Sequence, residues 1–265
     1  MLIKAYVITH KEQNMPVPGG FEPLLVGAAL HPEISCYKAK DNDGENISSK
    51  NKNYCELTGI YWIWKNIRAD VVGLCHYRRF FINSAKGVAV RDYLSTDDIE
   101  KLMQSYDVIV PVRHCYEKSV LESETFAPDK DDMAELTRAI EYAAPDYMES
   151  YKEFLSDNKV YFYNMFVMKK EYFDRYCEWL FKILFFIEKD YDISAKDEYK
   201  ARIFGFLSER LLMVWIKKNM PAERVCEMRV VFSSNTAFGK RKSEIVNEYR
   251  NLKWMIRKRF RKKKR

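Results

Sequence analysis

A cluster of ionisable side chains follows a short apolar run in the first third of the chain. His76, Tyr77, Arg78 and Arg79 come directly after residues 71–75, a run with the length and composition of a buried strand. A guanidinium group presents a planar fork of donors that suits phosphate oxygens. Adjacent arginines usually belong to a solvated surface, but open α/β sheets bind ligands at the carboxyl ends of their strands. The position therefore favours a binding site.

A helix predicted over residues 56–66 leads into this strand. Leu57, Tyr61 and Trp64 recur at helical spacing on one side of it. Trp62 lies two residues from Trp64, so the two indoles point to different sides. We expect Trp64, on the apolar stripe, to be the more buried of the two, and both aromatic rings to serve packing rather than ligand binding.

A second strand end carries polar side chains near the N-terminus. Residues 3–9 read as a buried first strand, which ends in Thr9, His10 and Lys11. In a doubly wound sheet, the loop after the first strand commonly lies against a nucleotide. We therefore expect these three residues near a nucleotide.

Two further positions place polar groups within apolar surroundings. Asn164 interrupts the strongly apolar run 160–168, where it is either a satisfied core residue or a site residue. Glu209 and Arg210 lie inside a predicted helix over residues 202–219. A pair of this kind is at least as often an ion pair on a solvated helix face.

The order of predicted elements indicates the fold class. Strands over residues 106–112 and 225–233 and a long amphipathic helix over 171–189 join those above. The alternation of strands and helices predicts an α/β fold with a mostly parallel or mixed central sheet. At 265 residues, we expect one α/β domain over residues 1–239, followed by a tail over residues 240–265.

Charge and cysteine usage separate the tail from the body. Residues 240–265 hold thirteen Lys and Arg against two Glu, a net charge of +11, which leaves 7 − 11 = −4 on residues 1–239. The six cysteines form no CxxC pair, and Lys4 interrupts the first apolar run. These features predict a cytoplasmic protein without a secretory signal. No apolar window is long enough for a transmembrane helix.

Common catalytic motifs are absent from the sequence. It contains no GxGxxG, Walker A, GxSxG or HExxH pattern. An alternative function is nucleic-acid association through the basic tail. The acidic body and the lack of a nucleic-acid motif outside the tail argue against it, as they do against a nucleic-acid partner in general.

Several segments together resemble a known bacterial family. VITHK, NISSKN, YCELTGIYWIWKN, GLCHYRRFF, YNMFVMKKEYFDRYCEWLF and RIFGFLSERLL are similar to the DUF4422 proteins, regarded as glycosyltransferases of capsule, exopolysaccharide and O-antigen clusters. The resemblance spans nearly all of residues 1–235. It implies a single GT-A-like, Rossmann-like domain that binds a nucleotide-sugar, with UDP as the expected nucleotide and a lipid-linked oligosaccharide as the expected acceptor. A non-catalytic nucleotide-sugar-binding protein is the further alternative that the resemblance leaves open.

The resemblance also suggests roles for individual residues. Many GT-A enzymes carry Asp-x-Asp after the strand where this chain has His76–Arg79, so a metal-independent enzyme is favoured, with Mn²⁺ or Mg²⁺ not excluded. Arg78 and Arg79 would then neutralise the leaving diphosphate, and Glu209 is a candidate catalytic base. A single histidine without nearby acids makes a weak case for a metal site. The implied donor-binding residues are Thr9, His10, Lys11, Asn51, Tyr54, Glu56, His76, Tyr77, Asn164, Arg202 and Arg210.

The basic tail has the pattern of a membrane-surface helix. Within residues 244–265, Ile245, Tyr249, Leu252 and Ile256 recur at helical spacing among many Lys and Arg. Such a basic amphipathic helix is typical of an anionic membrane interface, which predicts a peripheral location on the inner face of the plasma membrane. The alternative is a disordered, solubilising tail.

Overall fold

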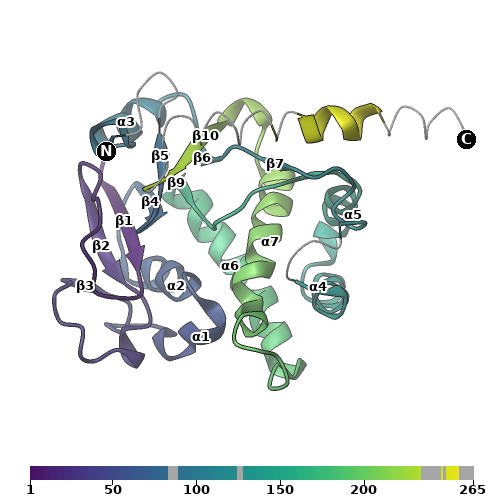
Figure 1. Ribbon diagram of the computed structural model, residues 1–265, viewed down its shortest axis with the longest axis horizontal. Helices are drawn as coiled ribbons and strands as arrows, with labels where there is room; N and C mark the ends of the chain where they lie inside the picture. Colours follow the sequence, from purple (N-terminus) through teal and green to yellow (C-terminus); the bar gives the residue numbers. More distant parts are fainter. Residues whose placement is uncertain (83–88, 124–127, 234–245, 247–248, 257–265) are drawn as a thin grey trace, which may run out of the picture.

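The computed structural model describes residues 1–82, 89–123, 128–233, 246 and 249–256. The chain forms a mixed α/β fold with one large central sheet (Figure 1). Ten strands are described: β1 (Ile3–Thr9), β2 (Phe21–Leu25), β3 (Ala39–Lys40), β4 (Val71–His76), β5 (Arg79–Ile82), β6 (Val108–Pro111), β7 (His114–Cys115), β8 (Lys159–Val160), β9 (Phe166–Lys169) and β10 (Val225–Phe232).

The sheet combines parallel and antiparallel pairs. Its strand order is β3-β2-β1-β4-β5-β10-β6-β9, and β7 pairs separately with β8. The strands β2, β1 and β4 run parallel, as do β10 and β6. β9 runs antiparallel to the first part of β4, and β5 folds back from the end of β4. The predicted mixed sheet is thus confirmed.

Seven labelled α-helices lie around the sheet: α1 (Asn51–Tyr54), α2 (Leu57–Asn66), α3 (Thr96–Leu102), α4 (Lys130–Ala143), α5 (Met148–Ser156), α6 (Lys170–Asp190) and α7 (Ile203–Asn219). Residues 249–256 form a further helix near the C-terminus. The predicted long helices correspond to α6 and α7. None of the helices in the described part of the chain combines the length and apolar composition needed to span a bilayer.

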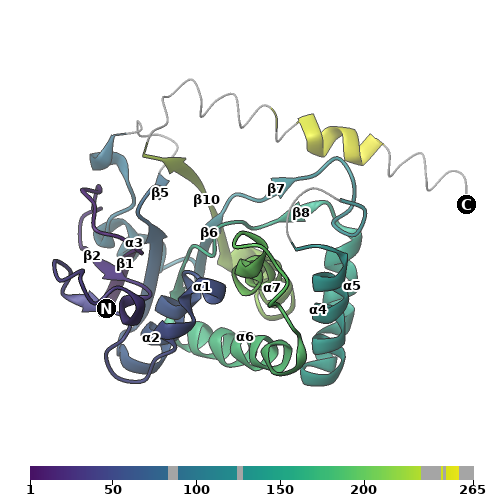
Figure 2. The ribbon, with the colours of Figure 1, turned by 60° about the horizontal axis from the view of Figure 1, so that its bottom comes forward.

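Side chains of alternating strand positions enter two different apolar layers. Tyr6 and Ile8 of β1 join a large cluster with α2, α4, α6 and α7. Ala5 and Val7 face the other side of the sheet and pack in a cluster that includes Ile99 of α3. This follows from the two-residue period of a strand. Figures 1 and 2 show α2 and α6 on the face opposite α3.

Gly59 allows α2 to lie directly against the sheet. A Cβ at this position would come within 2.6 Å of Cγ1 of Val26 and 3.3 Å of Cδ2 of Leu24. The absence of a side chain therefore sets how closely the helix approaches the segment after β2. Because α1 and α2 are consecutive, this contact also positions the residues at the start of α2, which include Glu56.

The two tryptophans of α2 are buried in the opposite order to that expected. Trp62 is 8% exposed, packs edge-on against Tyr6, and donates a hydrogen bond from Nε1 to the carbonyl oxygen of Asp43 at 2.7 Å. Trp64 is only half-buried and stacks on Phe181 of α6. The prediction was wrong because the sheet and the loop at Asp43 cover the side of α2 next to the apolar stripe.

Candidate active site

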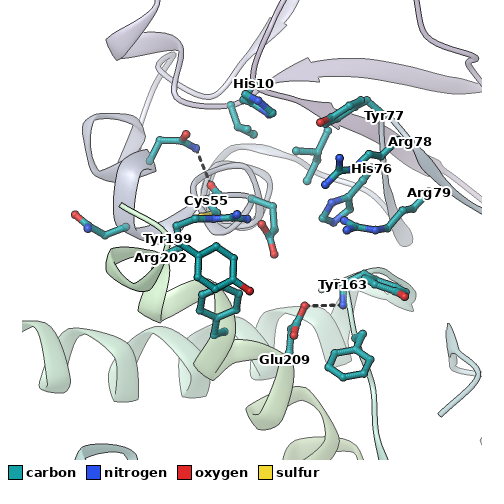
Figure 3. Close-up of a pocket in the computed structure, with 18 of the residues that line it drawn as sticks. His10, Cys55, His76, Tyr77, Arg78, Arg79, Tyr163, Tyr199, Arg202 and Glu209 are labelled. Atoms are coloured by element: carbon teal, nitrogen blue, oxygen red, sulfur yellow. Dashed lines mark hydrogen bonds between the residues drawn. The ribbon is translucent and has the colours of Figure 1, made fainter. Parts of the chain in front are cut away.

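A cavity of about 1080 Å³ opens at the carboxyl ends of β1 and β4. Its wall includes residues from these strand ends, from α1, from α7 and from the loop before β9. In Figure 3, His76, Arg78 and Arg79 lie on one side, Tyr199 and Arg202 on another, and Glu209 with Tyr163 below them. The position agrees with the strand-end site expected from the sequence.

A tight hairpin presents the basic pair to this cavity. β4 continues through His76, Tyr77 and Arg78 form the turn, and Arg79 begins β5 opposite His76. Arg78 is exposed at the turn, whereas the Arg79 guanidinium lies 4.5 Å from the ring centre of Tyr163. The two guanidinium groups therefore reach the cavity from one tight turn, where their charges add.

His76 is a buried, neutral imidazole beside this pair. Burial and the neighbouring positive charge of Arg79 lower the pKa of His76 to about 3. Its Nε2 atom is buried and has no hydrogen-bond partner among the described residues, and the same holds for Nε of Arg79. Buried polar atoms are rarely left unpaired in folded proteins. Both atoms lie on residues of the cavity wall, where a ligand can pair with them.

Two carboxylates, Glu56 and Glu209, line the same cavity. Oε1 of Glu209 accepts a hydrogen bond from the backbone N–H of Tyr163 at 2.8 Å, and Oε2 accepts one from Arg210 at 3.1 Å. Burial raises the pKa of Glu209 to about 7, although Arg210 opposes the shift. Burial also raises the pKa of Glu56. The side chains of Glu209 and Arg210 are 15% and 7% exposed, so the solvated ion pair considered from the sequence is wrong.

Asn164 supports the site from behind the cavity wall. Its Nδ2 donates to Oε1 of Glu56 at 2.6 Å and to the carbonyl oxygen of Gly205 at 3.0 Å. Asn164 is buried and does not belong to the cavity wall. The sequence left open whether Asn164 is a core residue or a site residue. The structure shows that it is a buried residue beneath the site and is hydrogen-bonded to Glu56, which lines the cavity.

The residues after β1 contribute to the cavity unequally. Thr9 and His10 lie in its wall, and the His10 ring meets Tyr77 edge-on at 5.5 Å between ring centres. Lys11 does not belong to the wall and places its ammonium group 5.5 Å from the Tyr77 ring centre. Thr9 and His10 therefore lie at the cavity as expected, whereas Lys11, which was expected with them, lies outside its wall.

The remaining predicted donor-binding residues divide between wall and core. Asn51, Arg202 and Arg210 belong to the cavity wall. Nε of Arg202 donates to Sγ of Cys55 at 3.2 Å. Tyr54 instead is fully buried, stacks on Phe204 with 4.3 Å between ring centres, and lies outside the wall. The structure thus corrects its placement, because the Tyr54 side of the short helix α1 packs on α7.

Several wall residues were not predicted from the sequence. They include Cys55, His114, Phe162, Tyr163, Glu198, Tyr199, Phe206 and Arg250. Tyr163 precedes Asn164, and both have positive φ angles, 83° and 46°. This turn breaks the apolar run 160–168, and an Asn within such a run was its only signal. The others become neighbours of the site only through tertiary packing.

The described residues contain no group of three or more His, Cys, Asp or Glu side chains arranged to hold a metal ion. His76, the one candidate raised from the sequence, faces Arg79 rather than an acid. Metal independence itself stays a prediction.

Two comparisons with known proteins found a match, one to a family profile and one to a solved structure. The profile of a family described as "Domain of unknown function (DUF4422)" matches residues 4–220. No curated protein sequence matches the chain. A solved structure, the bifunctional glycosyltransferase WbbM in its apo form, superposes with a TM-score of 0.77 at 29% identity. The match covers 89% of this chain and 46% of that chain, so this chain spans about half the length of WbbM.

Proposed function

Because the chain belongs to the DUF4422 family, and its fold is similar to that of a glycosyltransferase, we propose that it is a glycosyltransferase. It moves a hexosyl unit from a UDP-sugar to a hydroxyl group of a lipid-linked glycan, in the synthesis of a bacterial surface polysaccharide such as a capsule or O-antigen. One observation carries the proposal. Unpaired buried atoms of His76 and Arg79 and two partly buried carboxylates, Glu56 and Glu209, surround one cavity.

In the proposed mechanism the hairpin at the end of β4 binds the diphosphate. When the bond between the sugar and UDP breaks, negative charge develops on the leaving phosphate oxygen. Arg78 and Arg79 stabilise this charge, and the unpaired Nε of Arg79 supplies a buried donor. The neutral ring of His76 offers a further hydrogen bond without adding charge. Thr9, His10 and Tyr77 contact the nucleotide at the end of β1.

Glu209 is the proposed catalytic base. A carboxylate with a pKa near 7 accepts a proton from an acceptor hydroxyl far better than one at the usual 4.5. Its hydrogen bonds to Tyr163 and Arg210 orient the group. Glu56, held by Asn164, and Asn51 are placed to bind hydroxyl groups of the donor sugar. Burial raises the pKa of Glu56, and the hydrogen bond from Asn164 and the positive charge of Arg202 oppose this rise.

The proposed setting is the cytoplasmic face of the plasma membrane, with the anionic lipid surface bound through residues 244–265. Most of this segment, including the expected boundary at residues 239 and 240, lies outside the described residues. Residues 249–256 are described as a helix, and their sequence is basic and amphipathic, which supports this placement.

The function is tested by incubating the protein with a panel of UDP-sugars and measuring UDP release, with a lipid-linked glycan as acceptor. Thermal stabilisation by UDP, but not by RNA, is expected for the intact protein. Activity in the presence of EDTA should equal that with added Mn²⁺. No stabilisation by UDP would contradict the proposed donor, and activity lost with EDTA and restored by Mn²⁺ would contradict the role of Arg78 and Arg79 as the source of positive charge.

A further inference from the structure

The helix formed by residues 249–256 packs on the body in an unusual orientation. Arg250 places Nη1 3.0 Å from Nε2 of His114, and Lys253 forms an ion pair of 2.8 Å with Glu117. Both partners precede α4 and lie at or next to β7. Most apolar side chains of the helix instead remain open, with Tyr249 59% and Leu252 53% exposed, whereas Trp254 is partly buried. The helix therefore turns its basic groups toward the protein and most of its apolar groups away from it.

An amphipathic helix normally buries its apolar stripe against the core. Here Met255 and Ile256 are also nearly half exposed, at 45% and 47%. Figures 1 and 2 show this helix at the margin of the molecule, outside β7. Four apolar side chains on one short, marginal helix form a surface that water covers poorly. An external apolar partner would remove this cost.

The sequence around the helix identifies the chemistry of that partner. Directly after Ile256, eight of the nine residues 257–265 are Lys or Arg. A helix with an apolar stripe followed by a polybasic run matches the interface of an anionic bilayer, where apolar groups enter the acyl boundary and cations meet the headgroups. A nucleic acid would match the cations and leave the apolar stripe in water.

The same helix reaches the candidate active site. Arg250 belongs to the wall of the cavity together with His114, its contact partner. Burial and the charge of Arg250 lower the pKa of His114 to about 4, so the imidazole is neutral and can accept a hydrogen bond from the guanidinium. One face of this helix thus borders the cavity while another faces outward.

From these contacts we infer that residues 249–256 form a membrane-facing wall of the active site. The outer side, with Tyr249, Leu252 and Ile256, rests in the surface of an anionic bilayer. The inner side holds Arg250 at the cavity, next to the point where a lipid-linked acceptor enters. Membrane binding by the outer side of this helix does not depend on which reaction the protein catalyses. The role of Arg250 toward the acceptor, in contrast, rests on the proposed function.

The membrane surface is tested by vesicle sedimentation with the full-length protein. Vesicles of phosphatidylglycerol and phosphatidylcholine are compared with vesicles of phosphatidylcholine alone. We expect binding to the anionic vesicles only, weakened by salt. The double variant Leu252→Gln/Ile256→Gln should bind about tenfold or more weaker, because two apolar side chains no longer enter the bilayer. The control Leu121→Gln/Tyr142→Gln alters apolar residues of the body that are more exposed still, at 71% and 72%, and should bind like wild type.

Equal vesicle binding by the two double variants would overturn the inference, as would absence of binding by the wild type. UDP-induced thermal stabilisation is measured on the same samples and reports on the donor site alone. A protein that is stabilised by UDP and fails to bind vesicles contradicts this inference and leaves the proposed function standing. Vesicle binding without any effect of UDP contradicts the proposed function instead.

The link to the acceptor is tested by two variants that remove the same charge from the helix. Arg250→Gln should raise the KM for a lipid-linked acceptor about tenfold, the loss expected for one hydrogen bond from a charged group, with the KM for the UDP-sugar unchanged. Lys253→Gln removes a half-exposed ion pair and should change the acceptor KM little. Equal effects of the two variants on the acceptor KM would overturn the role of Arg250.

Discussion

Asn164 and Glu56, 108 residues apart in sequence, are joined by a hydrogen bond of 2.6 Å from Nδ2 to Oε1. The same amide nitrogen also donates to the carbonyl oxygen of Gly205 in α7. Asn164 adopts a φ of 46°, a left-handed conformation that Asn tolerates better than most residues. A single loop residue therefore ties the start of α2 to α7 and fixes a carboxylate of the candidate active site.

Replacing Asn164 by glycine should weaken both the fold and the site. Gly keeps the left-handed backbone and removes the amide, which leaves Glu56 and the Gly205 carbonyl without this donor. We expect a loss of about 1–3 kcal/mol in the free energy of unfolding, measured by urea denaturation, together with weaker UDP-sugar binding.

The control is Asn158→Ala, which removes another buried amide. Nδ2 of Asn158 donates to the carbonyl oxygen of Tyr116 at 2.9 Å, and Asn158 does not belong to the cavity wall. It should lower stability without changing donor affinity. Identical losses of donor affinity in the two variants would show that Asn164 acts only through stability.

The basic hairpin should be required for turnover rather than for folding. Arg78→Ala and Arg79→Ala are each expected to lower kcat about 10²–10³-fold, the usual effect of removing one electrostatic contact to a developing charge. Arg91→Ala, at an exposed arginine outside the wall, is the control and should leave kcat unchanged. Unaltered kinetics in both hairpin variants would contradict their role at the diphosphate.

Trp62 should contribute more to stability than Trp64. Trp62→Ala leaves a cavity against Tyr6 and an unpaired Asp43 carbonyl, so we expect a loss of about 3–5 kcal/mol in the free energy of unfolding. Trp64→Ala exposes one face of Phe181 at a partly solvated position and should cost less. Neither residue lies in the cavity wall, so UDP affinity should be unchanged. A larger loss for Trp64→Ala in denaturation experiments would disagree with the observed burial.

Local sequence patterns predicted most of the helices and strands. They also predicted the part of the site that the ends of β1 and β4 form. The apolar runs of β1 and β4 were recognisable because both faces of each strand are buried, and the polar residues at their ends, such as His10 and Arg79, could be placed by the general geometry of α/β sheets. The alternation of strands with helices predicts the parallel pairs of the sheet, whereas the antiparallel pairs made by β5 and β9 depend on how these strands return to the sheet.

The part of the site that residues outside β1 and β4 form depends on tertiary contacts, which no local sequence pattern encodes. Tyr199, Phe206 and His114 reach the cavity because α7 and the segment before it pack beside α1, and because β7 pairs with β8, which contacts α7. The reversed burial of Trp62 and Trp64 has the same origin, because the covering loop at Asp43 lies outside the helix. Helical periodicity identifies an apolar stripe, but not how far neighbouring segments extend beyond it.

Glu209 should control the pH dependence of both activity and stability. Burial raises its pKa from the usual 4.5 to about 7. If the ionised carboxylate accepts the proton of the acceptor hydroxyl, kcat/KM should fall about tenfold per pH unit below pH 7 and level off above it. Glu209→Gln should lose most activity, and its kcat/KM should no longer fall about tenfold per unit below pH 7. Glu198→Gln, which changes another acidic residue of the cavity wall, should still show this fall.

The raised pKa of Glu209 also determines how the free energy of unfolding changes with pH. The folded protein retains the Glu209 proton up to about pH 7, whereas the unfolded chain loses it near pH 4.5. Ionisation therefore favours the unfolded chain, and this carboxyl group lowers the free energy of unfolding as pH rises from about 4.5 to about 7. Urea denaturation at pH 5 and pH 8 should show a smaller decline for Glu209→Gln than for wild type. An equal decline in both proteins, with an activity midpoint near pH 4.5, would show that the group titrates as an ordinary glutamate and does not serve as the base.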